Sequence, residues 1–228
     1  THLRSALHGW AAMRLAQGLD AQWQPQIVHA HDWHAALAPT YLAFAPQPVG
    51  RPRVGSVYTV HNLAYQGLFA PWHLKELGLP PAAFQMNGLE FHGQLSFMKG
   101  GLCFADRITT VSPTYAREIQ TPEQGRGLDG VLRSRAQALS GILNAVDDRV
   151  WNPATDTLLP ERYDVKKMAA KARCKAALQA ELGLAVRPDA PLFILVSRLT
   201  EQKGLPLVLE GLDAIVAQGG QLALLGSG

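Results

Sequence analysis

Two kinds of apolar segment follow one another along the chain. In one kind the apolar residues are spaced three or four positions apart, and in the other they form short continuous runs. Continuous runs without alternation are typical of parallel strands covered on both faces, and the spaced patterns predict the helices that connect them. The fold class is therefore predicted to be α/β. Strands are expected at 27–30, 54–60, 107–111, 140–146, 191–196 and 221–225. Helices are expected over the first residues and at 35–44, 95–104, from Pro113 onward, 165–182 and 205–217.

The first helix carries a stripe of large apolar residues. Leu3, Leu7, Trp10 and Leu15 recur at helical spacing, with Ala11 and Met13 beside them. We expect this stripe to face the core.

Two segments show no sustained period. Residues 62–94 are rich in glycine, proline and aromatic residues, which predicts a long excursion with short helices. Loops of this length in compact domains are usually functional. Residues 147–164 contain Pro153 and Pro160, which suggests a linker or a surface arm. The predicted organisation is parts of two domains, at 1–146 and 165–228, joined by that linker.

Composition excludes several classes of protein. With 228 residues, 47% hydrophobic and 17% charged, the chain is globular. The net charge is only +3 and the lysine and arginine residues are scattered along the chain, so no basic surface for nucleic acid is expected. The longest apolar stretch, 190–196, is too short for a membrane helix.

The cysteine content and the two ends of the chain lead to expectations about its location and completeness. Only Cys103 and Cys174 are present, which favours a reducing compartment and a cytoplasmic location. No secretory signal follows Thr1, and the chain stops directly after an apolar run, so both ends are expected to be cuts.

Polar residues follow the predicted strands, at the edge where doubly wound sheets bind ligands. The segments are His29–His34, His61–Gly67, Asn144–Asp147, Ser197–Gly204 and Gly226–Gly228.

Three histidines after the first strand, at 29, 31 and 34, have the short spacing of metal ligands. No second ligand pair accompanies them, and we expect one of His29 and His31 to point into the sheet. A sugar-binding rim, in which Asp32 accepts hydroxyl protons and Trp33 offers an apolar face, uses this segment more fully, so no metal site is predicted.

Arg198 and Lys203 stand at a strand-to-helix junction, where a guanidinium and an ammonium group suit a diphosphate. Ordinary solvated surface charges remain an alternative. The closing Gly226-Ser227-Gly228 is compatible with close approach of the backbone to a nucleotide, although a bare G-x-G is a weak signal.

Five segments together resemble the bacterial glycogen synthases and plant starch synthases. They are HAHDWHA at 29–35, YTVHNLAYQG at 58–67, TVSPTYARE at 110–118, GILNAVD at 141–147 and VSRLTEQKGL at 196–205. The resemblance implies the GT-B arrangement, two Rossmann-like domains facing each other across a cleft, both incomplete here. It also implies a retaining glucosyltransferase that uses ADP-glucose as substrate, glycogen or another α-1,4-glucan as acceptor, and no metal ion or cofactor.

The resemblance also implies roles for individual residues. Arg198, Lys203 and His61 would be catalytic, and Arg198 and Lys203 would clamp the diphosphate. Gly226 and Gly228 would lie on the nucleotide side. His61 and Asn144 would hold the transferred glucose near its 6-hydroxyl. The remaining substrate-binding residues would be Asp32, Trp33, Asn62, Tyr65 and Gln66. The acceptor 4-hydroxyl would attack on the face that the phosphate leaves, and the phosphate would take the proton.

The chain also departs from the family pattern. A Lys-Thr-Gly-Gly-Leu loop and a later glutamate region that contacts the donor do not occur in it, and Ala145 stands where glycine is usual. We therefore expect an internal piece of a glycogen synthase, inactive by itself.

Two alternatives stay open. One is a GT-B enzyme with another donor, such as UDP-glucose or GDP-mannose. The other is a noncatalytic glucan-binding derivative, against which the Arg198 and Lys203 pair argues.

Overall fold

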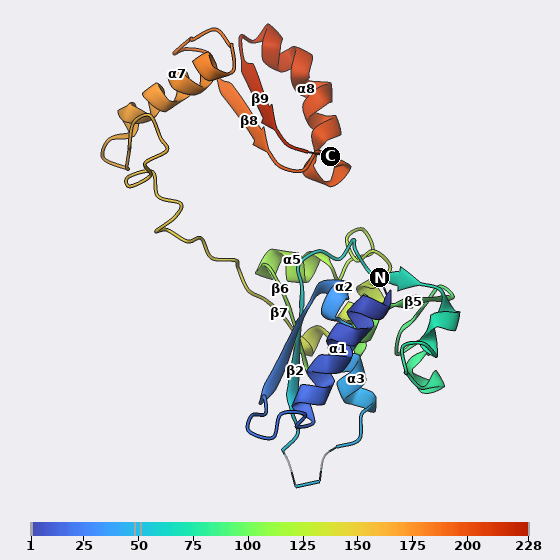
Figure 1. The fold of residues 1–228 in the computed structure, drawn as a ribbon. Helices are drawn as coiled ribbons and strands as arrows, with labels where there is room; N and C mark the ends of the chain where they lie inside the picture. Colours follow the sequence, from blue (N-terminus) through green and yellow to red (C-terminus); the bar gives the residue numbers. More distant parts are fainter. Residues whose placement is uncertain (1, 48, 51, 228) are drawn as a thin grey trace. The chain divides into compact units, whose positions relative to one another are not determined.

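The computed structural model describes residues 2–47, 49–50 and 52–227, which divide into two compact units, 1–145 and 146–228 (Figure 1). Both units contain parallel strands connected through helices. The predicted α/β class is thus confirmed.

The first unit is built on a four-stranded parallel sheet in the order β1-β2-β6-β7. Its strands are β1 (Ile27–His31), β2 (Gly55–Val60), β6 (Arg107–Thr110) and β7 (Leu139–Gly141). Since the strands are parallel, their carboxyl ends meet at one edge, where His31 lies opposite Thr59 and Val60 opposite Thr110. The polar segments predicted at the strand ends follow this edge.

The fourth strand is shorter than predicted. It ends at Gly141, and the apolar residues up to Val146 are exposed coil. A Cβ on Gly141 would lie 2.2 Å from the Ser112 carbonyl oxygen, so glycine is needed for the end of this strand to approach the backbone at Ser112.

Among the described residues, six α-helices accompany this sheet: α1 (His2–Ala16), α2 (Asp32–Ala35), α3 (Leu37–Phe44), α4 (Phe97–Phe104), α5 (Pro113–Glu118) and α6 (Asp129–Ser134). Ser112 caps α5 as predicted, because its hydroxyl accepts a hydrogen bond from the Tyr115 N–H at 2.9 Å. Helix α6 was not predicted, since six residues are fewer than two turns and show no period.

The predicted buried face of α1 was wrong for its large apolar residues apart from Met13, which is buried. Leu3, Leu7, Trp10 and Leu15 are all exposed, Leu7 at 63%. The helix instead packs on α3 through small residues, with Gly9 at the contact. A Cβ on Gly9 would lie 2.8 Å from the Ala38 nitrogen. The close approach of α1 and α3, and not the stripe of large apolar residues, therefore determines which face of α1 is buried.

The long excursion after β2 has the short helices expected and, in addition, three short strands that were not predicted. It contains β3 (Leu68–Phe69), η1 (Pro71–Leu74), η2 (Pro81–Ala83), β4 (Glu90–Phe91) and β5 (Gln94–Ser96), and the three strands form an antiparallel sheet. Lys99, only 5% exposed, donates from Nζ to the Glu90 and Met86 carbonyls, the latter at 2.7 Å. The excursion is therefore fastened to α4.

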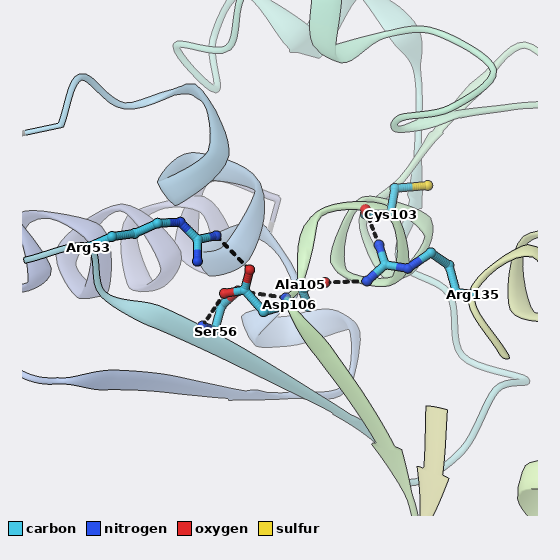
Figure 2. Close-up of polar contacts among 6 residues, drawn as sticks. All are labelled: Arg53, Ser56, Cys103, Ala105, Asp106 and Arg135. Carbon is cyan, nitrogen blue, oxygen red and sulfur yellow. Dashed lines mark hydrogen bonds and ion pairs between the residues drawn. The ribbon is translucent and has the colours of Figure 1, made fainter. Parts of the chain in front are cut away.

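Two polar clusters hold the segment that enters β6 (Figure 2). The Asp106 carboxylate accepts hydrogen bonds from Arg53 at 2.5 Å and from the N–H of Ser56 at 2.7 Å. Arg135 donates to the carbonyls of Cys103 and Ala105, both at 2.5 Å, and so satisfies carbonyl groups at the end of α4. The first cluster joins the beginnings of β2 and β6 to each other, and the second joins the end of α6 to the end of α4 just before β6.

The core of the first unit lies between the sheet and its helices. Its largest fully buried side chains include Tyr58 and Ile108 from the sheet and Phe97, Met98 and Leu102 from α4. Gly101 permits this packing, since a Cβ there would lie 2.8 Å from the Tyr58 ring.

The second unit contains η4 (Met168–Ala170), α7 (Lys171–Glu181), β8 (Leu192–Val196), η5 (Glu201–Lys203), α8 (Leu205–Ala217) and β9 (Gln221–Leu225). Strands β8 and β9 pair in parallel, as predicted. Helix α7 begins six residues later than expected, and Gly183 ends it with a φ of 69°.

Residues 147–164 contain no helix or strand. The expectation that both faces of every strand are covered was wrong for β8, where Phe193, Ile194 and Val196 are exposed in the described chain. A two-stranded sheet with helix α8 beside it cannot cover these side chains.

Among the described residues, no helix combines the length and the apolar character needed to cross a membrane.

Candidate functional site

A carboxylate joins the ends of β1 and β2. Asp32, directly after β1, has a φ of 52°, a left-handed conformation that aspartate tolerates better than most residues. From there its Oδ1 accepts hydrogen bonds from the backbone N–H groups of His61 at 2.8 Å and Asn62 at 3.4 Å. Asp32 thus fixes the backbone where the chain leaves β2.

Three histidines line this edge. His31 Nδ1 lies 3.0 Å from His61 Nε2, the His29 and His31 ring centroids are 4.2 Å apart, and His29 Nε2 bonds to Thr59 Oγ1 at 2.7 Å. Partial burial, together with the neighbouring imidazoles of His29 and His61, lowers the pKa of His31. The neutral form of His31 is therefore favoured at neutral pH.

The expectation that one of His29 and His31 points into the sheet was wrong. Residues two apart on a strand share a face, and the two rings are neighbours. Within the part of the chain that the structure describes, His29, His31 and His34 do not form a three-ligand metal group.

Trp33 forms an aromatic wall beside the histidines. Its ring centroid lies 3.9 Å from that of His34 and 5.9 Å from that of Phe69. Gly67, with a φ of 62°, lies against it, and a Cβ there would be 2.5 Å from Trp33 Cε3. The glycine of the Tyr-Gln-Gly segment is thus required both for its backbone conformation and for space.

The other residues predicted after β2 differ in exposure. Tyr65 is exposed, whereas Asn62 is half-buried and accepts a hydrogen bond from the Ala64 N–H at 3.0 Å. Gln66 is buried, and its Nε2 donates to the Arg126 carbonyl at 2.9 Å. Asn144 is exposed in the coil after β7.

The structure adds two supporting residues that sequence reasoning missed. The Tyr115 hydroxyl accepts a hydrogen bond from the Leu63 N–H at 3.1 Å, and Arg126, with a φ of 51°, presents its carbonyl to Gln66. Both lie more than fifty positions from their partners. No local pattern marks such pairs.

In the second unit the phosphate-binding candidates surround the junction of β8 with α8. Arg198 and Lys203 are both exposed, and the intervening chain is shaped by η5 and by Gly204, whose φ is 76°. Gly204 is also the N-cap of α8, so backbone N–H groups and the positive end of the helix dipole lie beside Lys203. This combination suits an anion.

The end of β9 lies against the same junction. The Leu199 N–H donates to the Ser227 carbonyl at 2.9 Å, and a Cβ on Gly226 would lie 2.1 Å from the Ser197 carbonyl oxygen. Glycine at 226 therefore allows the two chain segments to touch. Gly228, also predicted for the nucleotide side, lies outside the described residues.

Sequence reasoning also missed a group of three side chains elsewhere in the first unit. His2, His73 and Glu76 bring their ligand atoms within 4.8 Å of one another, although His2 and Glu76 are 74 positions apart. Only the fold brings them together.

Comparison with known proteins extends these observations. A family model described as the starch synthase catalytic domain matches residues 1–134. The chain is 73% identical to a glycogen synthase of Variovorax paradoxus over 230 residues, and 66% identical to one of Leptothrix cholodnii over 227 residues. It is fully covered in both comparisons but spans 46% and 47% of those proteins, about half their length.

A solved structure shows the same fold. It is the catalytic domain of starch synthase IV from Arabidopsis thaliana bound to ADP and acarbose, with a TM-score of 0.85 and 34% identity. The match covers 96% of this chain and 45% of that one. The chain belongs to the family of glycogen and starch synthases that share the starch synthase catalytic domain.

Proposed function

We propose that the protein containing this chain is a glycogen synthase, which transfers glucose from ADP-glucose to the non-reducing 4-hydroxyl of an α-1,4-glucan with retention of configuration. The observation that carries the proposal is the 73% identity, over the whole chain, to a protein named glycogen synthase. The strand-end geometry agrees with it, and the ADP in the starch synthase neighbour supports ADP as part of the donor. ADP-glucose is a substrate in this scheme, and no cofactor takes part.

In the second unit, Arg198 and Lys203 would bind the diphosphate, and Gly226 and Gly228 would lie beside the nucleotide. The support for this assignment is the helix start at Gly204, which adds backbone donors to the two cationic side chains. Charge on the phosphate grows as the glycosidic bond breaks, so donors fixed there stabilise the transition state more than the ground state.

In the first unit, His61 and Asn144 would hold the transferred glucose, while Asp32, Trp33, Asn62, Tyr65 and Gln66 would form the acceptor side. The structure suggests two kinds of role. Exposed groups such as Tyr65 and His61 are available to a sugar, whereas the buried Gln66 would act by positioning the backbone around it.

The reaction would need little covalent chemistry from the protein. The acceptor 4-hydroxyl oxygen bonds to the anomeric carbon on the face from which the phosphate departs, the bond from that carbon to the phosphate oxygen breaks, and the departing oxygen takes the hydroxyl proton. The chain supplies orientation and charge stabilisation.

We further propose that these 228 residues are inactive alone and that the protein is cytoplasmic. The first proposal is supported by the coverage of about half of each relative, and the second by the two free cysteines, Cys103 and Cys174.

Incubation with labelled ADP-glucose and glycogen tests both the activity of the full-length protein and the inactivity of the 228-residue chain. The full-length protein should incorporate label, and the 228-residue chain should not. Incorporation by the short chain would refute its inactivity. A full-length protein that prefers UDP-glucose, or that binds maltooligosaccharide with no effect of ADP and no turnover, would refute the proposed activity.

A further inference from the structure

We propose that His2, His73 and Glu76 form a binding site for a divalent transition-metal ion of the Zn²⁺ class. The site lies in the first unit, where the start of α1 meets η1 and the turn after it. His2 belongs to α1, His73 to η1 and Glu76 to the turn. It involves none of the residues assigned above to sugar or nucleotide.

The geometry centres on one carboxylate oxygen. Glu76 Oε2 lies 3.0 Å from His2 Nε2 and 2.9 Å from His73 Nδ1, and the two ring centroids are 4.0 Å apart. A tetrahedral zinc ion with bonds of about 2.0–2.2 Å separates its ligand atoms by roughly 3.3–3.5 Å. The two separations from Glu76 Oε2 would lengthen by a few tenths of an ångström to admit the ion, and the two imidazole nitrogens lie within 4.8 Å of each other.

The ligand set is chemically suited to zinc. Two imidazole nitrogens and one carboxylate oxygen are a known three-ligand set for Zn²⁺, with the fourth position left for water. Oxygen-preferring ions such as Mg²⁺ and Ca²⁺ would be disfavoured by the two nitrogens. On binding, each imidazole would give up the hydrogen bond to Glu76 and present a lone pair to the metal.

The surroundings limit the movement of the ligands. The histidine side chains are 19% and 24% exposed, against 50% for Glu76, so the imidazoles are held while the carboxylate remains open to solvent. The Phe69 ring lies 5.6 Å from that of His2 and 5.9 Å from that of Trp33. A metal ion here would fasten helix α1 to the excursion and so support the aromatic wall of the sugar-binding edge.

The test is titration of the metal-free 228-residue chain with Co²⁺ and Zn²⁺. We expect one Co²⁺ per chain with the visible absorption of a tetrahedral complex, displacement by Zn²⁺, and a rise in the thermal midpoint with Zn²⁺. Glu76→Gln and His73→Ala should weaken binding about tenfold or more and remove the thermal shift.

His8→Ala is the matched control, because His8 is exposed on the same helix as His2. It should bind metal like the unsubstituted chain. Equal affinity in all three variants would overturn the proposal, since chelation by His2 with its neighbouring backbone, or by scattered surface histidines, does not need His73 or Glu76. Absence of saturable binding in the unsubstituted, folded chain would overturn it as well.

Discussion

The carboxylate of Asp32 accepts a hydrogen bond from the backbone N–H of His61 at 2.8 Å, and the two residues stand at the carboxyl ends of neighbouring parallel strands. One side chain thereby sets where His61 leaves the sheet. The ring of the same histidine contacts His31, with His61 Nε2 3.0 Å from His31 Nδ1, so the backbone and the side chain of His61 are held by different neighbours. A substitution at Asp32 tests this arrangement.

Asp32→Ala should lower the free energy of unfolding of the 228-residue chain by about 2 kcal/mol, through loss of a charge-assisted hydrogen bond and the cost of alanine at positive φ. Asp32→Asn should cost less than half as much, because asparagine keeps an acceptor oxygen and tolerates the left-handed conformation. Urea unfolding measures both. Equal losses in the two variants would contradict a role for the acceptor oxygen.

Gly67→Ala and Gly78→Ala form a matched pair. Both glycines have positive φ, 62° and 67°, but a Cβ at 67 would collide with Trp33, whereas the one at 78 would have nothing within 4 Å. We expect about 1 kcal/mol of destabilisation at position 78 and about 2–4 kcal/mol at 67.

Tryptophan fluorescence would report the displacement of Trp33 in Gly67→Ala, and thermal unfolding would report the loss of stability. The Gly78 variant should leave the emission unchanged. Similar stabilities for the two variants would mean that the Trp33 contact relaxes without cost.

Arg198→Ala in the full-length protein should reduce turnover by about a hundredfold or more while changing the affinity for glucan little. The reason is that the proposed contact strengthens as charge develops on the leaving phosphate. Arg198→Lys should recover part of the rate, since it restores the charge but not the guanidinium fork.

Arg173→Ala is a suitable control for this measurement. Arg173 is an exposed arginine of the same unit, paired with Glu161 at 2.6 Å, and its loss should leave turnover unchanged. Steady-state rates at varied ADP-glucose and glycogen concentrations separate the two effects. Unchanged turnover in Arg198→Ala would remove this residue from the site.

The Asp106 cluster predicts a pH dependence of stability. Partial burial acts to raise the pKa of this carboxyl, but hydrogen bonds from Arg53 and Ser56 outweigh it and hold the pKa below its ordinary value of 3.8. Because the unfolded chain then binds more protons, the contribution is complete above about pH 4 and is lost as the pH falls through the lowered value.

Asp106→Asn should therefore lower the free energy of unfolding by about 1–2 kcal/mol at pH 7 and flatten its decline toward acid pH. Urea unfolding from about pH 3 to 7 measures this. Arg53→Gln should show a smaller loss, since both Ser56 hydrogen bonds remain. A variant curve parallel to that of the unsubstituted chain would contradict the assignment.

The parallel sheet was predictable because its signals are local. Runs such as 192–196 and 222–225 are apolar without interruption, and Ser112 followed by Pro113 marks a helix start by itself. The side chain of a strand-end residue such as Asp32 could likewise be placed at the binding edge from sequence.

What could not be predicted depends on contacts between distant segments. Gly9 against Ala38 turns helix α1 so that Leu7 is exposed, and no periodicity in the helix contains that information. Likewise His73 meets His2 only because η1 folds back on the first helix. Short spacing along the sequence instead pointed to His29, His31 and His34 as possible metal ligands.

The pairing of β2 with β6 also has a kinetic consequence. The Thr110 hydroxyl donates a hydrogen bond to the Val60 carbonyl, 50 positions away in the sequence. The whole excursion lies in the chain between β2 and β6, which are neighbours in the sheet. Loop closure over such a distance must precede the contacts that stabilise it, which slows folding. During synthesis, the edge of β2 that pairs with β6 stays unpaired until Thr110 has emerged, and an unpaired strand edge is a site where chains can aggregate.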